Sequence, residues 1–213
     1  MKMKTLEYIF DPLCGWCYGA APLIAILEAH PNVSLKLHGG GMMSGLNTKA
    51  VTSQLRDFVQ PHDARIAELT GQLFSDEYNN GLLKDETAIL DSTPPIAAII
   101  AAEQWDKAPA MLHAIQQAHY VKGLKVADVE VLKALARDIE IPVDEFERVF
   151  EDVINNQVDA HIQQSRELLS KVEGNGFPTL FEVRESQIIS HPISNYYGKP
   201  EAWQAYLDSQ LFT

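Results

Sequence analysis

The sequence of 213 residues is 46% hydrophobic and 22% charged, which is typical of a globular protein that can bury a substantial core. Its 17 Lys and Arg against 29 Asp and Glu give a formal net charge of -12, which disfavours nucleic acid and anionic membrane surfaces as partners. No stretch approaches the ~20 apolar residues of a membrane span. The first apolar run is also too short for a signal peptide, so we expect a cytoplasmic protein.

The first part of the chain is predicted to alternate strand, helix and strand. Residues 5–10 are apolar and β-prone and are followed by Asp-Pro, which predicts a strand. Apolar residues at helical spacing predict a helix over residues 14–29, and strict alternation predicts a second strand over residues 33–37. A unit of this length predicts two parallel strands joined by a right-handed crossover.

The middle of the chain shows no strand pattern between residues 47 and 173. Apolar residues instead recur at helical spacing, and prolines or polar residues mark several helix starts. Before the fifth helix, Asp144 with Glu147 predicts a capping box. The six predicted helices cover residues 48–59, 95–105, 109–121, 128–139, 144–155 and 158–172.

The last part of the chain returns to β-structure. Two β-prone runs within residues 179–191 predict a hairpin, and residues 200–211 predict a closing helix. The order β-α-β, helical block, β-β-α favours one mixed sheet with helices inserted over one face. We therefore predict an α/β protein with a discontinuous sheet domain, residues 1–46 and 174–213, and a helical insertion, residues 47–173.

The only two cysteines, Cys14 and Cys17, stand three positions apart at the predicted start of the first helix. This spacing puts both on one helix face, where their sulfurs can meet. Free backbone N–H groups and the positive end of the helix dipole favour the thiolate of Cys14. We expect Cys14 to be exposed, acidic and attacking, and Cys17 to be shielded and to resolve the mixed disulfide.

Zinc is the main rival explanation for a Cys-x-x-Cys pair. A structural zinc site needs about four ligands, and this chain has no third cysteine. His113 and His119 are six positions apart, which is not a usual ligand spacing. We therefore expect no bound metal.

The segment Phe10–Gly19, FDPLCGWCYG, resembles the active-site segment of the DsbA-like branch of the thioredoxin superfamily. The resemblance implies a thioredoxin fold interrupted by a helical domain. It also implies a protein thiol–disulfide oxidoreductase or isomerase that acts on protein or peptide thiols and disulfides, with glutathione as a candidate redox co-substrate. Further segments that resemble this branch are 93–102, 118–121, 128–136 and 176–180, whereas residues 42–90 match least.

The resemblance also implies roles for residues around the cysteines. Pro178 is expected to have a cis peptide bond and to face the CGWC motif, and Phe177 to present its backbone to a substrate peptide. Gly15 and Trp16 are assigned to substrate binding, Trp16 as an exposed apolar surface. Pro22 is expected to kink the first helix.

The sequence departs from the family pattern at Tyr8 and at the Gly15-Trp16 dipeptide, which lacks the histidine of DsbA, and the roles of three other side chains stay open. Many relatives have a buried acid six residues before the first cysteine, where this chain has Tyr8. Glu7 either replaces that acid through a local bulge or faces solvent. His38 and His191 end predicted strands, and each lies either near the cysteines or in an ordinary loop.

Two other functions stay open. The first is a glutathione-dependent isomerase or transferase of the 2-hydroxychromene-2-carboxylate isomerase or kappa-class type. Those enzymes typically use a single Ser or Cys at the first position, so Cys17 argues against this function. The second is an adaptor or chaperone that binds peptides around Trp16 and Phe177 without redox chemistry.

Overall fold

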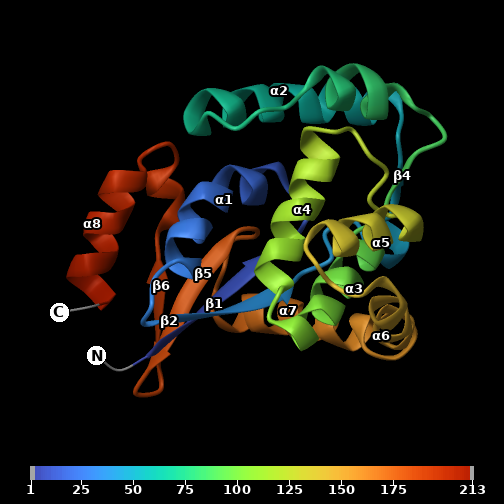
Figure 1. The fold of residues 1–213 in the computed structure, drawn as a ribbon. Coiled ribbons are helices and arrows are strands. Elements are labelled where there is room, and N and C mark those ends of the chain that lie inside the picture. Colours follow the sequence, from blue (N-terminus) through green and yellow to red (C-terminus); the bar gives the residue numbers. More distant parts are fainter. Residues whose placement is uncertain (1–2, 212–213) are drawn as a thin grey trace.

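The computed structural model describes residues 3–211 and contains a four-stranded sheet in the order β2-β1-β5-β6 (Figure 1). Strand β1 runs parallel to β2 and antiparallel to β5, and β5 is antiparallel to β6. The mixed sheet predicted from the sequence is therefore confirmed. Its strands are β1 (Lys4–Phe10), β2 (Val33–Gly39), β5 (Thr179–Arg184) and β6 (Gln187–His191).

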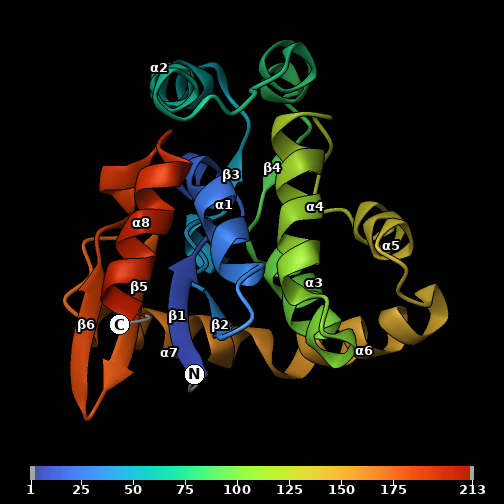
Figure 2. The same cartoon turned by 60° about the vertical axis from the view of Figure 1, so that its left-hand side comes forward.

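Side chains alternate between the two faces of the central strand β1, as the pleat requires. Tyr8 and Phe10 belong to the main core, whereas Ile9 packs with Phe181 and Val172 in a second cluster. Helices α1 (Gly15–Glu28) and α8 (Pro200–Leu211) lie on one side of the sheet and α7 (Val158–Lys171) on the other (Figure 2). Since both faces are covered, the last three residues of β1, Tyr8, Ile9 and Phe10, are all buried although they alternate between the faces.

Six helices follow one another in the middle of the chain, as expected. Helix α7 contacts β2 and so packs directly on the sheet, whereas α4 contacts α1. The division of the chain at residues 47 and 173 stays a prediction. The helices are α2 (Ser53–Thr70), α3 (Thr93–Ala102), α4 (Ala108–Tyr120), α5 (Val129–Asp138), α6 (Val143–Asn156) and α7 (Val158–Lys171).

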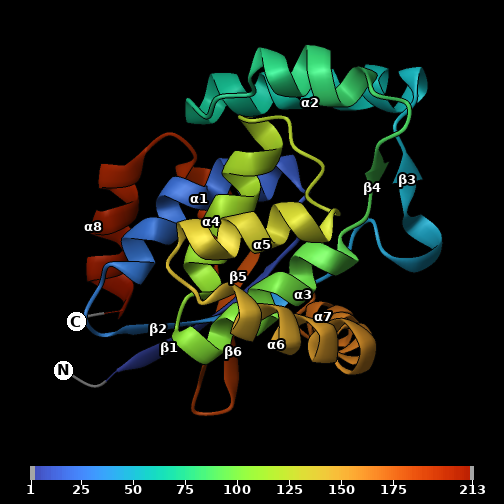
Figure 3. The same cartoon turned by 45° about the vertical axis from the view of Figure 1, so that its right-hand side comes forward.

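Three details of the middle region differ from the prediction. Two short strands, β3 (Lys49–Ala50) and β4 (Ile89–Leu90), pair with each other (Figure 3), and two residues are too few to show a strand period. The first helix does not cover residues 48–59. It starts after Thr52, whose hydroxyl accepts a hydrogen bond from the N–H of Leu55, and continues through Pro61.

The third difference concerns the predicted capping box, which is wrong. Pro142 is the N-cap of α6, so Asp144 lies inside the first turn and Glu147 one turn later. Asp144 there faces the positive end of the helix dipole instead of capping it.

The C-terminal hairpin and closing helix are confirmed. Glu185 and Ser186 form the turn between β5 and β6 with φ values of 50° and 71°, which suit the twist of a tight hairpin. On α8, the indole N–H of Trp203 donates to the carbonyl of Leu23 at 3.0 Å and so ties α8 to α1. Pro22 lies inside α1, and the bend expected there stays a prediction. Within residues 3–211, no helix has both the length and the apolar character needed to span a membrane.

Candidate active site

Cys14 is the N-cap residue of α1 and has extended backbone angles, φ -87° and ψ 116°. Its carbonyl accepts hydrogen bonds from the N–H groups of Cys17 and Tyr18, at 3.0 Å each, which begins the helix. The unpaired N–H groups of the first turn and the positive helix end therefore lie beside this cysteine. The expectation that Cys14 is acidic stays a prediction.

Both cysteines are reduced and both are buried, with exposed fractions of 6% for Cys14 and 1% for Cys17. The expectation that Cys14 is exposed is wrong, because segments distant in the sequence cover it. Burial raises the pKa of the Cys17 thiol well above its ordinary value, and a hydrogen bond with the Cys14 side chain raises it further. The two side chains are therefore close enough to interact.

The segment before β5 reaches the attacking sulfur. The Phe177–Pro178 peptide bond is cis, as the resemblance implies. The carbonyl oxygen of Phe177 accepts a hydrogen bond from the Cys14 sulfur at 3.7 Å. The fold thus brings together two segments that lie 163 positions apart in the sequence.

Trp16 is half-buried, because its ring stacks on Tyr197 with ring centres 5.6 Å apart. The Tyr197 hydroxyl also donates to the Trp16 carbonyl at 2.9 Å. The ring therefore lies against the protein's own surface and is less exposed than expected.

Two hollows flank the motif, and Trp16 lines both. The first, of about 610 Å³, is lined by Phe177, Pro178 and neighbouring segments of the sheet domain. The second, of about 520 Å³, is mostly apolar and lies between Cys14, Gly15 and helix α2. Gly15, Trp16 and Phe177 are thus in position to contact a substrate, and their role in substrate binding stays a prediction.

Asp11 is a residue that the sequence prediction missed. It is completely buried, and its carboxylate accepts hydrogen bonds from the N–H of Leu13 at 2.8 Å, the N–H of Met42 at 2.5 Å and the hydroxyl of Ser92 at 3.0 Å. Burial raises its pKa to about 6 although these donors act in the opposite direction. Asp11 therefore connects the turn that precedes Cys14 to the loop that follows β2 through hydrogen bonds.

Arg166 of α7 holds the same loop from the other side. Its guanidinium donates to the carbonyls of Gly40, at 2.9 Å, and Gly41, and to the hydroxyl of Ser44 at 3.0 Å. Gly41 has a φ of 65°, a conformation that glycine adopts at little cost. The glycine run is thus a loop fixed beside the active site.

A family model of the DSBA-like thioredoxin domain matches residues 5–190. The chain belongs to this family. Together with the paired cysteines at a helix start, membership makes the chain a DsbA-like thiol–disulfide oxidoreductase. No curated protein matches the sequence.

Solved structures of DsbA-like proteins agree with this assignment. The cytosolic disulfide reductase DsbM from Pseudomonas aeruginosa is 42% identical over 97% of this chain and 98% of that chain, with a TM-score of 0.91. The same protein with GSH is 41% identical over 98% and 100%, with a TM-score of 0.90. A candidate protein disulfide isomerase from Nitrosomonas europaea is 27% identical over 99% and 98%, with a TM-score of 0.78.

A 2-hydroxychromene-2-carboxylate isomerase is more distant. It is 15% identical over 96% of this chain and 97% of that chain, with a TM-score of 0.60. This similarity shows a shared fold only, and it does not assign the isomerase activity to this chain.

In this member of the family, Glu7 neither replaces the missing acid nor faces solvent. Strand β1 pairs with β2 residue for residue without a bulge, so Tyr8 keeps its place. The Glu7 carboxylate contacts His38 at 2.6 Å and Lys36 at 3.6 Å. His191 is buried and its Nδ1 lies 3.0 Å from the Tyr206 hydroxyl. His38 and His191 thus each have a partner other than the cysteines.

The DsbA-like site also contains three buried polar residues that no sequence signal indicated. The Tyr78 hydroxyl donates to Asp63 at 3.0 Å, and burial raises the pKa of Asp63 to about 7. Burial lowers the pKa of His119 to about 3. All three line the hollow between Cys14 and α2. Within residues 3–211, no three His, Cys, Asp or Glu residues gather as a possible metal site.

Proposed function

We propose that this protein reduces protein or peptide disulfides in the cytoplasm, with glutathione returning the CGWC pair to its dithiol form. The observation that carries the proposal is the contact of the Cys14 sulfur with the Phe177 carbonyl, with the buried Cys17 one turn behind it. The reducing direction is supported by 42% identity to a disulfide reductase whose structure is also solved with GSH.

The exchange proceeds in two halves. The Cys14 thiolate attacks one sulfur of the substrate disulfide, so that a bond forms to Cys14, the substrate S–S bond breaks, and the first substrate thiolate leaves and takes up a proton. Cys17 then loses its proton and attacks the Cys14 sulfur, which releases the second substrate thiol. Two glutathione molecules reduce the resulting Cys14–Cys17 disulfide and leave as glutathione disulfide.

The hollow beside Phe177 is the proposed site for glutathione and for an extended substrate peptide. It offers backbone groups of a sheet edge, which pair with extended chains. Among the described residues that line this hollow, Arg65 is the only Lys or Arg. Its guanidinium would attract the carboxylates of glutathione. Because the chain has a net charge of -12, a local cation is needed to favour an anionic tripeptide.

The cysteine roles are tested with Cys14→Ser and Cys17→Ser. We expect Cys14→Ser to abolish reduction of insulin with glutathione as donor. Cys17→Ser should accumulate a mixed disulfide between Cys14 and the substrate, which mass spectrometry detects. Insulin reduction at wild-type rates in both variants would contradict the mechanism, and glutathione-dependent activity that survives Cys17→Ser would favour a transferase or isomerase instead.

The glutathione site is tested with Arg65→Gln. We expect a KM for glutathione raised about tenfold, because a charge-assisted contact is lost. Arg56→Gln on the same helix is the matched control, since Arg56 lines neither hollow. Equal KM values for the two variants would place glutathione elsewhere.

A further inference from the structure

The second half of the exchange poses a problem that the residues around Cys14 do not solve. Cys17 must lose a proton before it attacks, yet it is only 1% exposed and burial raises the pKa of its thiol. A buried thiol in an apolar site reacts slowly unless a proton acceptor reaches it. The structure must therefore offer a path from Cys17 to an acceptor.

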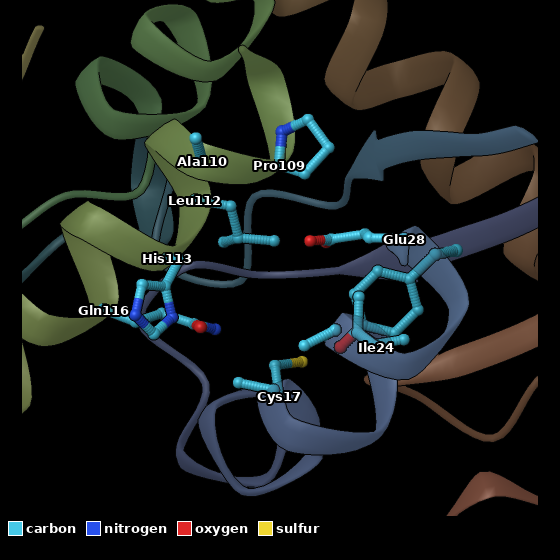
Figure 4. A pocket seen from close by; sticks show the side chains of 11 residues that line it. Cys17, Ile24, Glu28, Pro109, Ala110, Leu112, His113 and Gln116 are labelled. Atoms are coloured by element: carbon cyan, nitrogen blue, oxygen red, sulfur yellow. The ribbon is translucent and has the colours of Figure 1, made fainter. Parts of the chain in front are cut away.

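A separate cavity reaches Cys17 from behind. It encloses about 290 Å³ between α1 and α4, and Cys17 and Glu28 face it from α1 while His113 and Gln116 face it from α4 (Figure 4). Cys14 does not line this cavity, and Cys17 lines neither hollow beside Cys14. Substrate and proton thus have different routes to the cysteine pair.

Tyr8 also lines this cavity, in the position where many relatives have an acid. Its hydroxyl is buried beside the Cys17 thiol and makes no hydrogen bond of good geometry with any group of residues 3–211. Burial raises the pKa of Tyr8 well above 10, and the adjacent Cys17 raises it further, so the phenol stays protonated. A buried hydroxyl without a partner costs about 1–3 kcal/mol, and water in the cavity would satisfy it.

The cavity has room for such water. Each water molecule takes about 30 Å³ of liquid volume, so several fit, and polar groups of Tyr8, Gln116 and His113 are available to them. Glu28 lies on the lining too. Part of its side chain is exposed to solvent, while partial burial of its carboxyl raises its pKa to about 7, so it can take up a proton near neutral pH and pass it to solvent.

We propose that this cavity is the proton exit of Cys17, with Tyr8 orienting water beside the thiol and Glu28 accepting the proton. In this step the Cys17 S–H bond breaks, its electron pair forms the bond to the Cys14 sulfur, and the bond from Cys14 to the substrate sulfur breaks. The substrate leaves as thiolate, and the proton from Cys17 passes through water to the Glu28 carboxylate. The step is the same whichever disulfide substrate is used.

Other ionisable groups surround both ends of the route. Asp11, Cys14, Tyr8 and Tyr197 surround Cys17. Among residues 3–211, five ionisable residues share a neighbouring hollow of about 710 Å³ with Glu28: Lys36, His38, Glu103, Asp106 and His161. His113 faces Glu28 across the cavity. The test therefore removes single groups and follows the second step alone.

The experiment separates the two halves of the exchange with an aromatic disulfide reagent, dithiobis(nitrobenzoate). One equivalent first forms a mixed disulfide on Cys14, and attack by Cys17 then releases a second coloured thiolate. We expect Tyr8→Phe and Glu28→Gln each to slow the second release about tenfold or more near neutral pH, within the usual range for general-base assistance. Alkylation of Cys14 by iodoacetamide should keep its wild-type rate.

The pH profile distinguishes proton transfer from a loss of packing. Above about pH 7, where Glu28 is ionised in the wild type, hydroxide increasingly replaces the missing acceptor, so the deficit of both variants should shrink as pH rises further. Glu201→Gln, an exposed carboxyl on α8, is the control and should match the wild type at every pH. A deficit that is the same at all pH values, or that affects both releases equally, would overturn the proposal.

Filling the cavity gives an independent test. Ala110 lines it from α4, and Ala110→Leu should displace water and slow only the second release. A wild-type second release in Ala110→Leu, in a variant that folds with an ordinary Tm, would also overturn the proposal. These outcomes do not test the proposed role of glutathione, because dithiobis(nitrobenzoate) replaces the disulfide substrate in this assay.

Discussion

The ring of Phe177 occupies the place where a side chain at Gly40 would begin. A Cβ atom built on Gly40 would lie 2.1 Å from the nearest ring carbon of Phe177. The N–H of Gly40 also donates to the carbonyl of Phe10 at 2.7 Å, which fixes the loop against β1. The absence of a side chain at residue 40 therefore lets Phe177 reach Cys14.

Gly40→Ala should push the Phe177 ring away and break the contact between its carbonyl and the Cys14 sulfur. We expect a lower Tm and a severalfold slower first attack on a disulfide, measured by the first release from dithiobis(nitrobenzoate). Gly81→Ala is the control, because no atom lies within 4 Å of its added Cβ and its φ is negative. Identical rates in the two variants would show that the ring adjusts freely.

Asp11→Asn should destabilise the protein by about 1–3 kcal/mol. The carboxylate satisfies three donors, and an amide replaces one of its acceptor oxygens by a fourth donor. Denaturant unfolding at neutral pH measures the loss, with Asp57→Asn on the exposed side of α2 as the control. If both variants unfold at the same denaturant concentration, the Asp11 network contributes nothing to stability.

The stability of the protein should depend on pH through Asp63. Burial raises the pKa of this carboxyl from 3.8 to about 7, so folding favours its protonated form. The stability it contributes is present below about pH 4 and is lost as pH rises through about 7. Asp63→Asn keeps an oxygen for Tyr78 and avoids this loss.

We therefore expect Asp63→Asn to be more stable than the wild type at about pH 8, by up to roughly 4 kcal/mol, and equal near pH 4. Urea unfolding at both pH values measures the difference. Glu68→Gln, which is exposed on the same helix, should show no such pH-dependent gain. A constant difference at both pH values would contradict the prediction.

Trp16→Ala should make Cys14 more accessible. The indole lines both hollows beside the cysteine and rests on Tyr197. We expect alkylation by iodoacetamide to become severalfold faster, with Cys17 remaining unmodified because it is buried. Tyr197→Phe keeps the stacking and should change the rate much less; a slower reaction of Trp16→Ala would mean that the indole activates the thiol instead of covering it.

Local sequence patterns predict the sheet and the cysteine pair well. The alternation of β2, the apolar run of β1 and the turn of the hairpin are properties of a few adjacent residues, and the spacing of Cys14 and Cys17 needs only one helical turn. The helix that contains Pro61 was predicted too short, because an interior proline removes a hydrogen bond and usually ends a helix.

The surroundings of the site depend on distant contacts and could not be predicted. A Cβ on Gly15 would lie 2.9 Å from both Asp63 and Ile66, so glycine within the motif permits α2 to approach it closely. Nothing in the residues near Gly15 indicates which helix lies there. The same holds for the cavity behind Cys17, whose walls come from α1 and α4, and for the burial of Cys14.

The 6% exposure of Cys14 limits which disulfides it can reach. Attack requires the incoming sulfur to align with the bond that breaks, and here that alignment is possible only inside a recess. A disulfide held rigidly on the flat surface of a folded protein cannot enter such a recess. We therefore expect small disulfides, and those in loose or unfolded chains, to react faster with Cys14 than disulfides held rigidly in a folded surface.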